Sequence, residues 1–231
     1  MRSVFIEYDP YNRLGNRMFQ YAFGYIVAKK FNCPLYSVEG LPNFGIKPNP
    51  PDINLNQERI YTRDIGDQYF DFDLLETFNG DLFINSWVQK TSYYINHREE
   101  LRRIFGIRDL EMVNKDELII HIRETDYKTV GVFLGYEFYK RLIDEQKFKS
   151  VKIVTDNPKG EAIIKLINDG CSLSTDGEAT TFNHHGDKRA IADFKTLLYS
   201  ENIAISQSSF AWWPAFLGDH KKVIFPYSCG P

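Results

Sequence analysis

Apolar and polar residues along the first half of the chain predict short buried strands separated by helices. The segments Ser3–Glu7, Leu35–Val38 and Leu82–Trp87 are mainly apolar and of strand length. Asn16–Phe31 is apolar on nearly every face, which is typical of a helix buried on several sides. Ser92–Phe105 is predicted to form a second helix, with charged residues on its outer face.

The second half of the chain repeats the order of strand and helix more regularly. We predict strands at Leu118–Ile122, Val151–Thr155, Asn202–Ile205 and Lys222–Phe225, and helices at Tyr136–Phe148, Pro158–Asn168, Lys188–Ser200 and Phe210–Leu217. Strands that alternate with helices indicate a parallel sheet with crossover connections, so the predicted fold class is α/β.

Two segments lack a regular pattern. Gly40–Asp52 contains four prolines and no periodicity, which predicts a loop or a linker. Asn54–Asn79 mixes charged and aromatic residues without a clear period. We therefore expect the first half to be less regular than the second.

Polar clusters follow three of the predicted strands in the second half. His121–Asp126 ends the first strand, Thr155–Asn157 ends the next, and Ser206–Ser209 ends the third and opens a helix. In open parallel sheets, ligands bind outside the carboxyl ends of the strands. The topology alone therefore predicts a binding site formed by these three clusters.

The residue types in these clusters suit a nucleoside diphosphate. Arg123 offers a forked guanidinium, and serine hydroxyls at a helix N-terminus add donors for an anion. Asp156 and His121 could contact a ribose or a base. The chain has neither a Walker lysine motif nor a GxGxxG fingerprint, which argues against a P-loop nucleotide site and a dinucleotide site.

Each feature also has an ordinary structural interpretation. Arg123 resembles a surface ion-pair residue, the SQSSF segment an N-cap, and His121 a hydrogen-bonded core residue. His184 and His185 lack a third ligand at a zinc spacing, and Asp71-Phe-Asp73 is a DxD that arises easily by chance. The Trp212-Trp213 pair is typical of packing between a helix and a sheet.

Composition indicates a globular protein of one or two domains but does not indicate which reaction or ligand it serves. The 231 residues fit one large domain or two small ones, and a net charge of −3 gives no nucleic-acid footprint. Aromatic residues are unusually frequent at 15%. The three cysteines are odd in number and widely spaced, which favours small buried residues in a reducing compartment over a disulfide framework. No apolar stretch is long enough for a membrane helix or a signal peptide, so the predicted location is the cytoplasm.

Four segments together resemble one known family. NRLGNRMFQYAFG at 12–24 resembles GxLGNQMFQYA, the glycine-loop motif of the α-1,2-fucosyltransferases of glycosyltransferase family 11. IIHIRETDY at 119–127 resembles their HxRRGDY motif, and IVTDN at 153–157 resembles their SDD strand end. DFKTLLYSENIAISQSSFAWWPAFLG at 193–218 resembles DFxLMSxCxxxIISNSSFSWWxAWL. The segments occur in the family's order and span most of the chain.

The resemblance implies a GT-B-like fold of two facing Rossmann-like domains with mainly parallel sheets. It implies a glycine-loop, acceptor-side domain over residues 1–110 and a domain that binds the nucleotide sugar over residues 111–231. The implied activity is an inverting, metal-independent transfer of L-fucose from GDP-fucose to a hydroxyl of a glycan, with an α-1,2 linkage. The α-1,6- and protein O-fucosyltransferases are related to this family.

Matching the motifs position by position implies roles for individual residues. Arg123 matches the arginine that grips the β-phosphate, and Asn16 matches the glycine-loop residue near the sugar. The residues that match donor-binding positions, or lie in the matching loop, are His121, Asp156, Ser208, Ser209, Gly15 and Arg17. Physically, an arginine suits this reaction because a leaving diphosphate without a metal needs a permanent cation.

The chain departs from the family pattern at several positions. Glu124 stands where the family has its second arginine, and Arg17 stands where it has glutamine. We hypothesise that Arg17 replaces the missing charge across the cleft. Either Glu124 or Asp126 is a candidate general base for the acceptor hydroxyl, and the sequence does not choose between them.

Three alternatives stay open at this stage. A transferase of the same fold could use another nucleotide sugar. The replacement at Glu124 also leaves room for a catalytically silent module that binds nucleotide sugars. A metal-dependent transferase would use Asp71 and Asp73, and chelation would abolish its activity.

Overall fold

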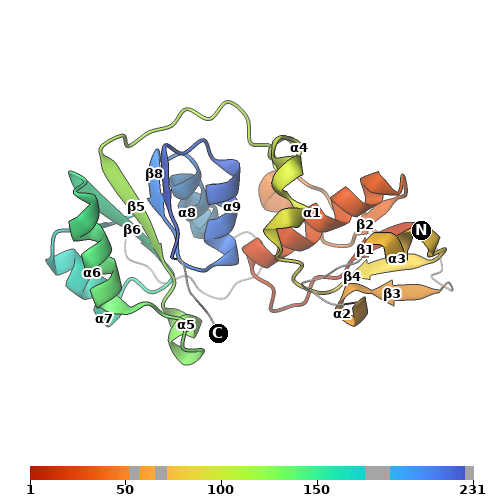
Figure 1. The fold of residues 1–231 in the computed structure, drawn as a ribbon, viewed down its shortest axis with the longest axis horizontal. Coiled ribbons are helices and arrows are strands. Elements are labelled where there is room, and N and C mark those ends of the chain that lie inside the picture. The colour runs from red at the N-terminus through yellow and green to blue at the C-terminus, as the bar shows by residue number, and fades with distance from the viewer. Residues whose placement is uncertain (52–57, 66–71, 175–187, 227–231) are drawn as a thin grey trace. The chain divides into compact units, whose positions relative to one another are not determined.

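A computed structural model describes residues 1–51, 58–65, 72–174 and 188–226. The chain divides into two compact units, Met1–Arg108 (unit 1) and Asp109–Pro231 (unit 2). The resemblance to the fucosyltransferases implies a boundary after residue 110. Each unit contains its own sheet, and every strand pair within these sheets is parallel. Figure 1 shows this α/β organisation in both units.

Unit 1 is built around a four-stranded sheet in the order β2-β1-β4-β3. Its strands are β1 (Ser3–Ile6), β2 (Leu35–Ser37), β3 (Arg59–Tyr61) and β4 (Asp81–Ile84). Its helices are α1 (Leu14–Lys30), α2 (Thr62–Ile65), α3 (Phe72–Thr77) and α4 (Arg98–Ile104), with short 3-10 turns η1 (Pro42–Phe44), η2 (Thr91–Tyr93) and η3 (Ile95–His97).

Helix α1 packs closely on the aliphatic face of this sheet. A Cβ added to Gly24 would lie 3.0 Å from Ile84 Cδ1 and 3.2 Å from Ile6 Cδ1. The absence of a side chain at Gly24 therefore allows the helix to approach the strands. This contact accounts for the nearly all-round apolar character of Asn16–Phe31, since much of α1 is buried.

A row of aromatic rings crosses the opposite face of the unit 1 sheet. Phe5 stacks on Tyr36 at 5.1 Å between ring centroids and on Phe83 at 4.7 Å, and Phe83 meets Tyr61 at 5.1 Å. Each ring belongs to a different strand, and the register places them side by side. Part of the aromatic excess therefore stabilises a small sheet through cross-strand pairs.

Unit 2 contains a five-stranded sheet in the order β7-β6-β5-β8-β9. Its strands are β5 (Glu117–Ile122), β6 (Ser150–Thr155), β7 (Ser172–Leu173), β8 (Asn202–Ala204) and β9 (Lys222–Ile224). Its helices are α5 (Thr125–Thr129), α6 (Gly135–Gln146), α7 (Glu161–Asn168), α8 (Lys188–Leu198) and α9 (Ser209–Leu217).

Helices cover both faces of the unit 2 sheet. Leu118, Ile120 and Ile122 of β5 belong to the core on the side of α6 and α7. Ile119 belongs to the second core, with Leu197 of α8 and Ala211 of α9. Figure 1 shows these two helical layers on either side of β5 and β6. The strands are apolar on both faces because both faces are buried.

Most predicted elements agree with the structure to within a few residues, but the helix predicted at Ser92–Phe105 is wrong. Only Arg98–Ile104 is α-helical, and the preceding segment forms η2 and η3. The amides of Tyr94 and His97 bond to carbonyls three residues earlier, which is 3-10 geometry. Five short strands and α-helices were also missed: β3, α2 and α3 in the irregular middle segment, α5 after β5, and β7 after α7.

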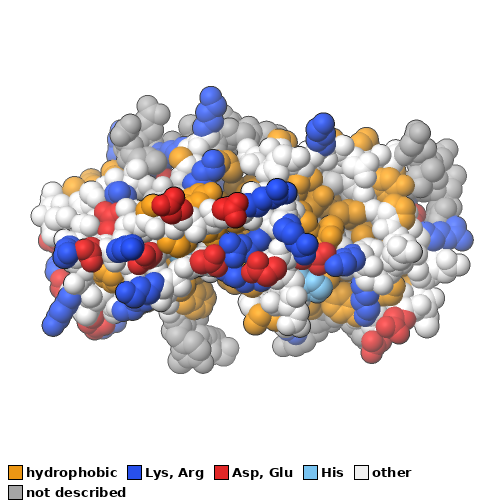
Figure 2. Space-filling view, turned by 90° about the horizontal axis from the view of Figure 1, so that it is seen from above, with side chains coloured by type: hydrophobic (Ala, Val, Ile, Leu, Met, Phe, Trp, Pro, Cys, Tyr) orange, Lys and Arg blue, Asp and Glu red, His pale blue; other side chains and the backbone are white. Residues whose placement is uncertain are grey.

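Charges on the surface are mixed. On the face shown in Figure 2, acidic and basic side chains of the described residues are interspersed rather than separated into fields of one sign. None of the helices in the described ranges has the length and hydropathy needed to cross a bilayer. The two described cysteines, Cys33 and Cys171, are free thiols, and Cys229 lies outside the described residues.

Candidate functional site

The unit 2 sheet changes direction next to its central strand. The chain passes from β5 to β6 and β7 on one side, and then returns to place β8 and β9 on the other. The carboxyl ends of β5 and β8 therefore form a topological switch point, which is where open α/β sheets bind ligands. His121–Asp126 and Ser206–Ser209 follow these two ends, as the sequence predicted.

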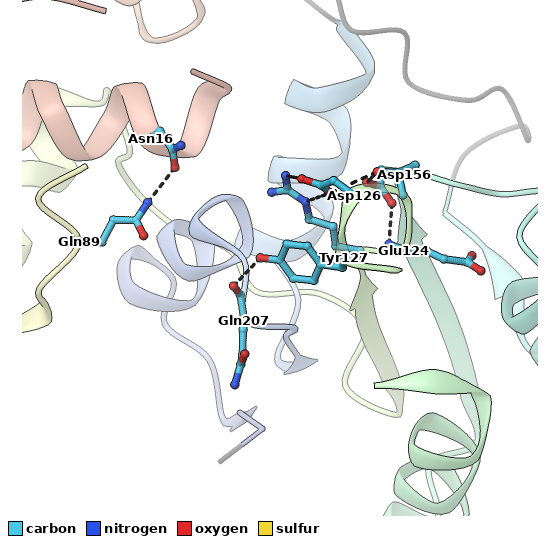
Figure 3. Close-up of polar contacts among 9 residues, drawn as sticks. Asn16, Gln89, Glu124, Asp126, Tyr127, Asp156 and Gln207 are labelled. Carbon is cyan, nitrogen blue, oxygen red and sulfur yellow. Dashed lines mark hydrogen bonds and ion pairs between the residues drawn. The ribbon is translucent and has the colours of Figure 1, made fainter. Parts of the chain in front are cut away.

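Strand alternation separates the residues at the end of β5. His121 has the same parity as Ile119, and its ring faces Ser206 and Phe210 on the side of α9. Glu124 has the parity of Ile122 and lies on the side of α7. Figure 3 shows the Glu124 side chain directed away from Asp126 and Asp156.

His121 is a buried, neutral imidazole. Its Nδ1 and Ser206 Oγ share a hydrogen bond of 2.8 Å, and its ring centroid is 5.7 Å from that of Phe210. Burial lowers the pKa of His121 to about 4, because a charged ring would lose its hydration there. The ring is therefore uncharged at neutral pH and can serve as a hydrogen-bonding group.

Arg123 is held in a fixed orientation by two neighbours. Its Nε donates to Asp126 Oδ1 at 2.8 Å, and its Nη2 donates to Asp126 Oδ2. The guanidinium also lies 4.7 Å from the centroid of the Tyr127 ring. Burial opposes the charge, but the hydrogen bonds that Arg123 donates to Asp126 outweigh it and raise the pKa of Arg123. Arg123 therefore forms an ion pair, but its side chain is only 15% exposed, so it is not the surface residue of the ordinary interpretation. The pair uses Nε and Nη2 and does not involve Nη1.

Tyr127 joins the two sides of the switch point. Its hydroxyl donates a hydrogen bond of 2.6 Å to the Gln207 carbonyl, which belongs to the segment after β8 (Figure 3). Burial raises the pKa of Tyr127, so the hydroxyl stays protonated and remains a donor. Tyr127 thus supports Arg123 with its ring and fixes the facing loop with its hydroxyl.

Asp156 connects the end of β6 to the end of β5. Its Oδ1 accepts from the Glu124 amide at 2.9 Å, and its Oδ2 accepts from Thr125 Oγ1 at 2.5 Å (Figure 3). The carboxylate therefore fixes the chain just after Arg123.

Ser208 and Ser209 lie at the start of α9. Ser208 is the N-cap residue, yet its side chain makes no capping hydrogen bond. Its Oγ is buried close to Tyr127 and makes no hydrogen bond of good geometry among the described residues. The ordinary N-cap interpretation therefore fails for the Ser208 side chain. A buried hydroxyl at a helix N-terminus is a suitable donor for an anion.

Glu124 is enclosed on the opposite side of the strand end. Its side chain is fully buried and forms an ion pair with Lys128, one turn along α5. Asn157 Nδ2 lies 3.4 Å from its Oε2, and a Cβ added to Gly160 would lie 1.6 Å from the same oxygen. Glu124 is therefore not brought together with Arg123, Asp126 and His121.

Asn16 lies at the switch point of unit 1, between β1 and β4. Its Oδ1 accepts a hydrogen bond of 2.8 Å from Gln89 Nε2, which follows β4 (Figure 3). Gly15 precedes it in the first turn of α1. Unit 1 therefore also has polar residues at the carboxyl edge of its sheet.

Arg17 is neutralised within unit 1. Its Nη1 lies 2.6 Å from Glu39 Oε2, its Nε donates to the Asn12 carbonyl at 2.9 Å, and its guanidinium lies 4.8 Å from the Tyr8 ring. The side chain is 5% exposed. The hypothesis that Arg17 replaces a missing charge is therefore not supported by its contacts, which instead tie the loop after β1 to the segment after β2.

The sequence analysis missed a second partly buried arginine in unit 2, whose side chain is 15% exposed. Arg189 of α8 donates from Nη2 to the Thr155 carbonyl at 3.3 Å, at the carboxyl end of β6. Its Nε lies 3.8 Å from Oδ2 of Asp193, which is also buried. The available signal was a charged pair four residues apart on the core-facing side of a predicted helix.

The other sequence candidates divide between packing and undescribed segments. Trp213 is fully buried, and its ring lies 4.9 Å from that of Trp212, which stacks on Phe216. These rings pack on one another within α9, and the predicted packing of the pair between helix and sheet stays a prediction. His184, His185 and Asp71 lie outside the described residues. Among the described residues, no group of three or more histidine, cysteine, aspartate or glutamate side chains could hold a metal.

Comparisons with solved structures place this architecture among known folds. NodZ, an α-1,6-fucosyltransferase soaked with GDP-fucose, superposes with a TM-score of 0.57 at 11% identity, over 94% of this chain and 92% of NodZ. POFUT1 in complex with GDP gives 0.54 at 12% identity, over 97% of both chains. The fold matches the GT-B-like fold of fucosyltransferases.

A third solved structure has the same fold, whereas comparisons of sequence alone find no related protein or family. A mutant of Arabidopsis thaliana FUT1 in complex with GDP gives a TM-score of 0.56 at 11% identity, over 99% of this chain and 71% of that one. No protein-family model matches the chain. No curated protein matches it in sequence. The similarity therefore shows the fold, and the chemistry has to be argued from the site.

Proposed function

We propose that this protein is a fucosyltransferase, which transfers L-fucose from GDP-fucose to a hydroxyl of a glycan with inversion at the sugar carbon. The observation that carries the proposal is the fixed guanidinium of Arg123 at the switch point of unit 2, opposite the N-terminus of α9. The solved proteins of the same fold, bound to GDP or GDP-fucose, support the choice of donor.

The geometry suits a leaving diphosphate. Cleavage of the bond between fucose and phosphate develops negative charge on GDP and positive charge on the sugar. Arg123 would stabilise the diphosphate through Nη1, while Ser208 Oγ and the amides that open α9 would donate to the same anion. Because Asp126 and Tyr127 already orient the guanidinium, little reorganisation is needed when the charge develops.

His121 and Asp156 would position the nucleoside. Neutral His121 keeps Nε2 for a ligand, because Nδ1 is engaged by Ser206. Asp156, which holds the chain after Arg123, would accept from a ribose hydroxyl. Arg189 lies near Asp156 at the end of β6 and would add a second cation at this edge. Unit 2 would thus bind the donor.

Two measurements test this function. We expect GDP-fucose, but not UDP-sugars, to release its nucleoside diphosphate in a transfer assay with a panel of oligosaccharides. Replacing Arg123 with alanine should reduce kcat by at least about 100-fold, the effect of removing a preorganised electrostatic donor. Arg123→Lys should recover only part of this loss, because an ammonium lacks the fork.

The same assay addresses the alternatives. We propose a metal-independent reaction, so EDTA should leave the rate unchanged, and a rate abolished by EDTA would contradict that part of the proposal. The anomeric configuration of the product, measured by NMR, would show inversion or retention. Release of UDP but not GDP would indicate another sugar donor. GDP binding without any turnover would indicate a silent binding module.

Asp126 is the better placed of the two candidate bases. Its side chain is 43% exposed, whereas that of Glu124 is fully buried on the other side of the strand end. Both oxygens of Asp126 are engaged by Arg123, so a proton-accepting role requires this pair to open when the substrates bind.

Asp126→Asn separates the two roles of this carboxylate. If Asp126 is the base, kcat should fall by about 100- to 10,000-fold, and added formate should restore part of the rate. If it only orients Arg123, formate should have no effect and the KM for GDP-fucose should rise. The measurement is the initial rate of GDP release with and without formate.

A further inference from the structure

The carboxyl edge of the unit 1 sheet carries large apolar side chains that are exposed. Tyr11 follows β1 and is 85% exposed, and Trp87 follows β4 and is 56% exposed. The register pairs β1 directly with β4, so the two residues belong to neighbouring loops at the same edge. Exposed aromatic residues at a switch point mark a candidate ligand surface.

The buried side chain of Gln20 connects the residues next to these two rings. Asn12, next to Tyr11, donates from Nδ2 to Gln20 Oε1 at 3.2 Å. Gln20, which is fully buried in α1, donates from Nε2 to the carbonyl of Ser86, next to Trp87, at 3.2 Å. Gln20 therefore ties together the two chain segments that carry the exposed rings, and these hydrogen bonds fix the backbone next to each ring.

The backbone beside Trp87 is strained. Val88 has a φ of +42°, a conformation that is a clear outlier for a β-branched residue. The surroundings hold it there, because its side chain is fully buried and its carbonyl accepts a hydrogen bond of 2.5 Å from Tyr94 Oη. Strain of this kind gathers at ligand-binding sites, where it re-aims neighbouring side chains. Here the neighbours are Trp87 and Gln89.

Amide groups complete the surface. Gln89, directly after the strained residue, bonds to Asn16 at 2.8 Å, so two amide side chains lie at the same switch point. Aromatic rings provide flat apolar contacts, and amides provide both donors and acceptors. A pyranose has the matching chemistry, since its C–H faces are apolar and its rim carries hydroxyls.

We propose that Tyr11 and Trp87 form a stacking subsite for a sugar ring of the acceptor, with Asn16 and Gln89 as hydrogen-bonding partners for its hydroxyls. This proposal rests on the proposed function in one respect, because the sugar is an acceptor only if the protein is a transferase. The ligand chemistry itself, a pyranose ring, is argued from unit 1 alone.

The test uses the whole protein without a donor. Saturation-transfer NMR would be recorded with lactose, N-acetyllactosamine, chitobiose and mannobiose as separate probes, with and without GDP. We expect at least one disaccharide to receive saturation at its ring C–H protons. Trp87→Ala and Tyr11→Ala should each weaken its binding by about tenfold or more, as for aromatic residues central to a contact. Trp87→Phe should keep part of the affinity.

Matched variants guard against a purely structural effect. Ile95→Ala removes an equally exposed apolar side chain from η3 in the same unit, 60% exposed, and should leave binding unchanged. Urea unfolding should show that Trp87→Ala and Tyr11→Ala are as stable as the wild type, since both side chains are exposed. Tyr94→Phe, which releases the Val88 carbonyl, should weaken saccharide binding but not GDP binding.

The outcomes separate this proposal from the proposed function. If GDP-fucose is used but the Trp87 and Tyr11 variants retain the acceptor KM and saccharide affinity, the subsite is wrong and the function stands. If GDP does not bind but saccharide binding depends on Trp87, the function is wrong and the sugar-binding surface stands. A wild-type protein that binds none of the four disaccharides, with or without GDP, overturns the subsite. Self-association that Trp87→Ala abolishes would assign the surface to a protein contact and overturn it too.

Discussion

At the scale of single residues, burial decides what each candidate side chain can do. His121, Arg123 and Glu124 occur within four positions, and all three are ionisable. Burial makes the imidazole neutral, while paired carboxylates keep the Arg123 and Lys128 charges compensated. The same stretch of sequence therefore provides a neutral hydrogen-bonding group, an oriented cation and an enclosed anion.

The neutral state of His121 predicts how stability depends on pH. Its pKa is about 4 in the folded protein, against about 6.5 in an unfolded chain. The unfolded state therefore binds more protons below pH 6.5, and stability falls as the pH decreases from about 6.5 towards 4. We expect this group to account for a loss of about 3 kcal/mol across that window.

His121→Asn is the control for this effect, because asparagine can bond to Ser206 without titrating. Urea unfolding at pH 7.5, 5.5 and 4.5 would measure both proteins. The wild type should lose more stability than the variant as the pH falls. Equal losses would show that other groups cause the acid sensitivity.

Residue types alone identified Arg123, His121 and the serines as candidates, because a polar run after an apolar strand is visible in sequence. The sequence could not show that Asp126 accepts from both Nε and Nη2 of Arg123, or that Arg17 is paired with Glu39. Those contacts depend on rotamers and on neighbours from other segments. Arg189 and Asp193 were overlooked because their helix was read for its apolar spacing.

At the scale of elements, neighbouring residues at the end of β5 lie on opposite sides of the unit 2 sheet. Within β5, successive side chains point to opposite faces, so His121 faces Phe210 of α9 and Ile122 faces the core of α6 and α7. Glu124 follows the end of the strand and lies against Gly160, at the start of α7. The resemblance placed Glu124 where the family has a second arginine. The fold instead encloses it between α5 and the start of α7, where Gly160 makes room for its carboxylate.

This arrangement predicts a specific coupling between Glu124 and Gly160. Gly160 has an ordinary φ of −64°, so alanine there is not strained in its backbone, and the three atoms nearest to its Cβ would all belong to the Glu124 carboxylate. Gly160→Ala should destabilise the protein by about 1–3 kcal/mol, the usual range for overpacking. In the double variant Glu124→Ala/Gly160→Ala, the added methyl group should cost far less, because the carboxylate is gone.

A double-mutant cycle measured by urea unfolding tests this coupling. Additive losses would show that the two residues do not share the space. Lys128→Met provides a further reference, since it removes the partner of Glu124 and keeps Gly160 unchanged. It should destabilise the protein by leaving a buried carboxylate without its cation.

At the scale of the whole molecule, two sheets with separate cores predict separate responses to a ligand. The donor site is proposed to lie in unit 2, and the sugar-stacking surface is proposed to lie in unit 1. GDP should therefore stabilise the transition of unit 2, by about 2.7 kcal/mol at a free concentration of ~100 times its Kd. Differential scanning calorimetry with increasing GDP would measure this.

The assignment of each transition follows from variants in each unit. Arg123→Ala should abolish the shift that GDP causes, and Ile95→Ala should leave it intact. A GDP-dependent shift that persists in Arg123→Ala would contradict the placement of the donor in unit 2. A shift of both transitions by the same amount would contradict their independence.

The sequence by itself determined the α/β class, most strand and helix positions, and the polar clusters after β5, β6 and β8, because these follow from local periodicity and turn chemistry. Only the tertiary structure decided which clusters meet, that Glu124 is enclosed, and that Tyr11 and Trp87 are exposed on neighbouring loops. Strand order and side-chain pairing are non-local, and a sequence pattern carries no direct record of them. The irregular middle segment was missed for the same reason: β3 has three residues, and its pairing with β4 stabilises it.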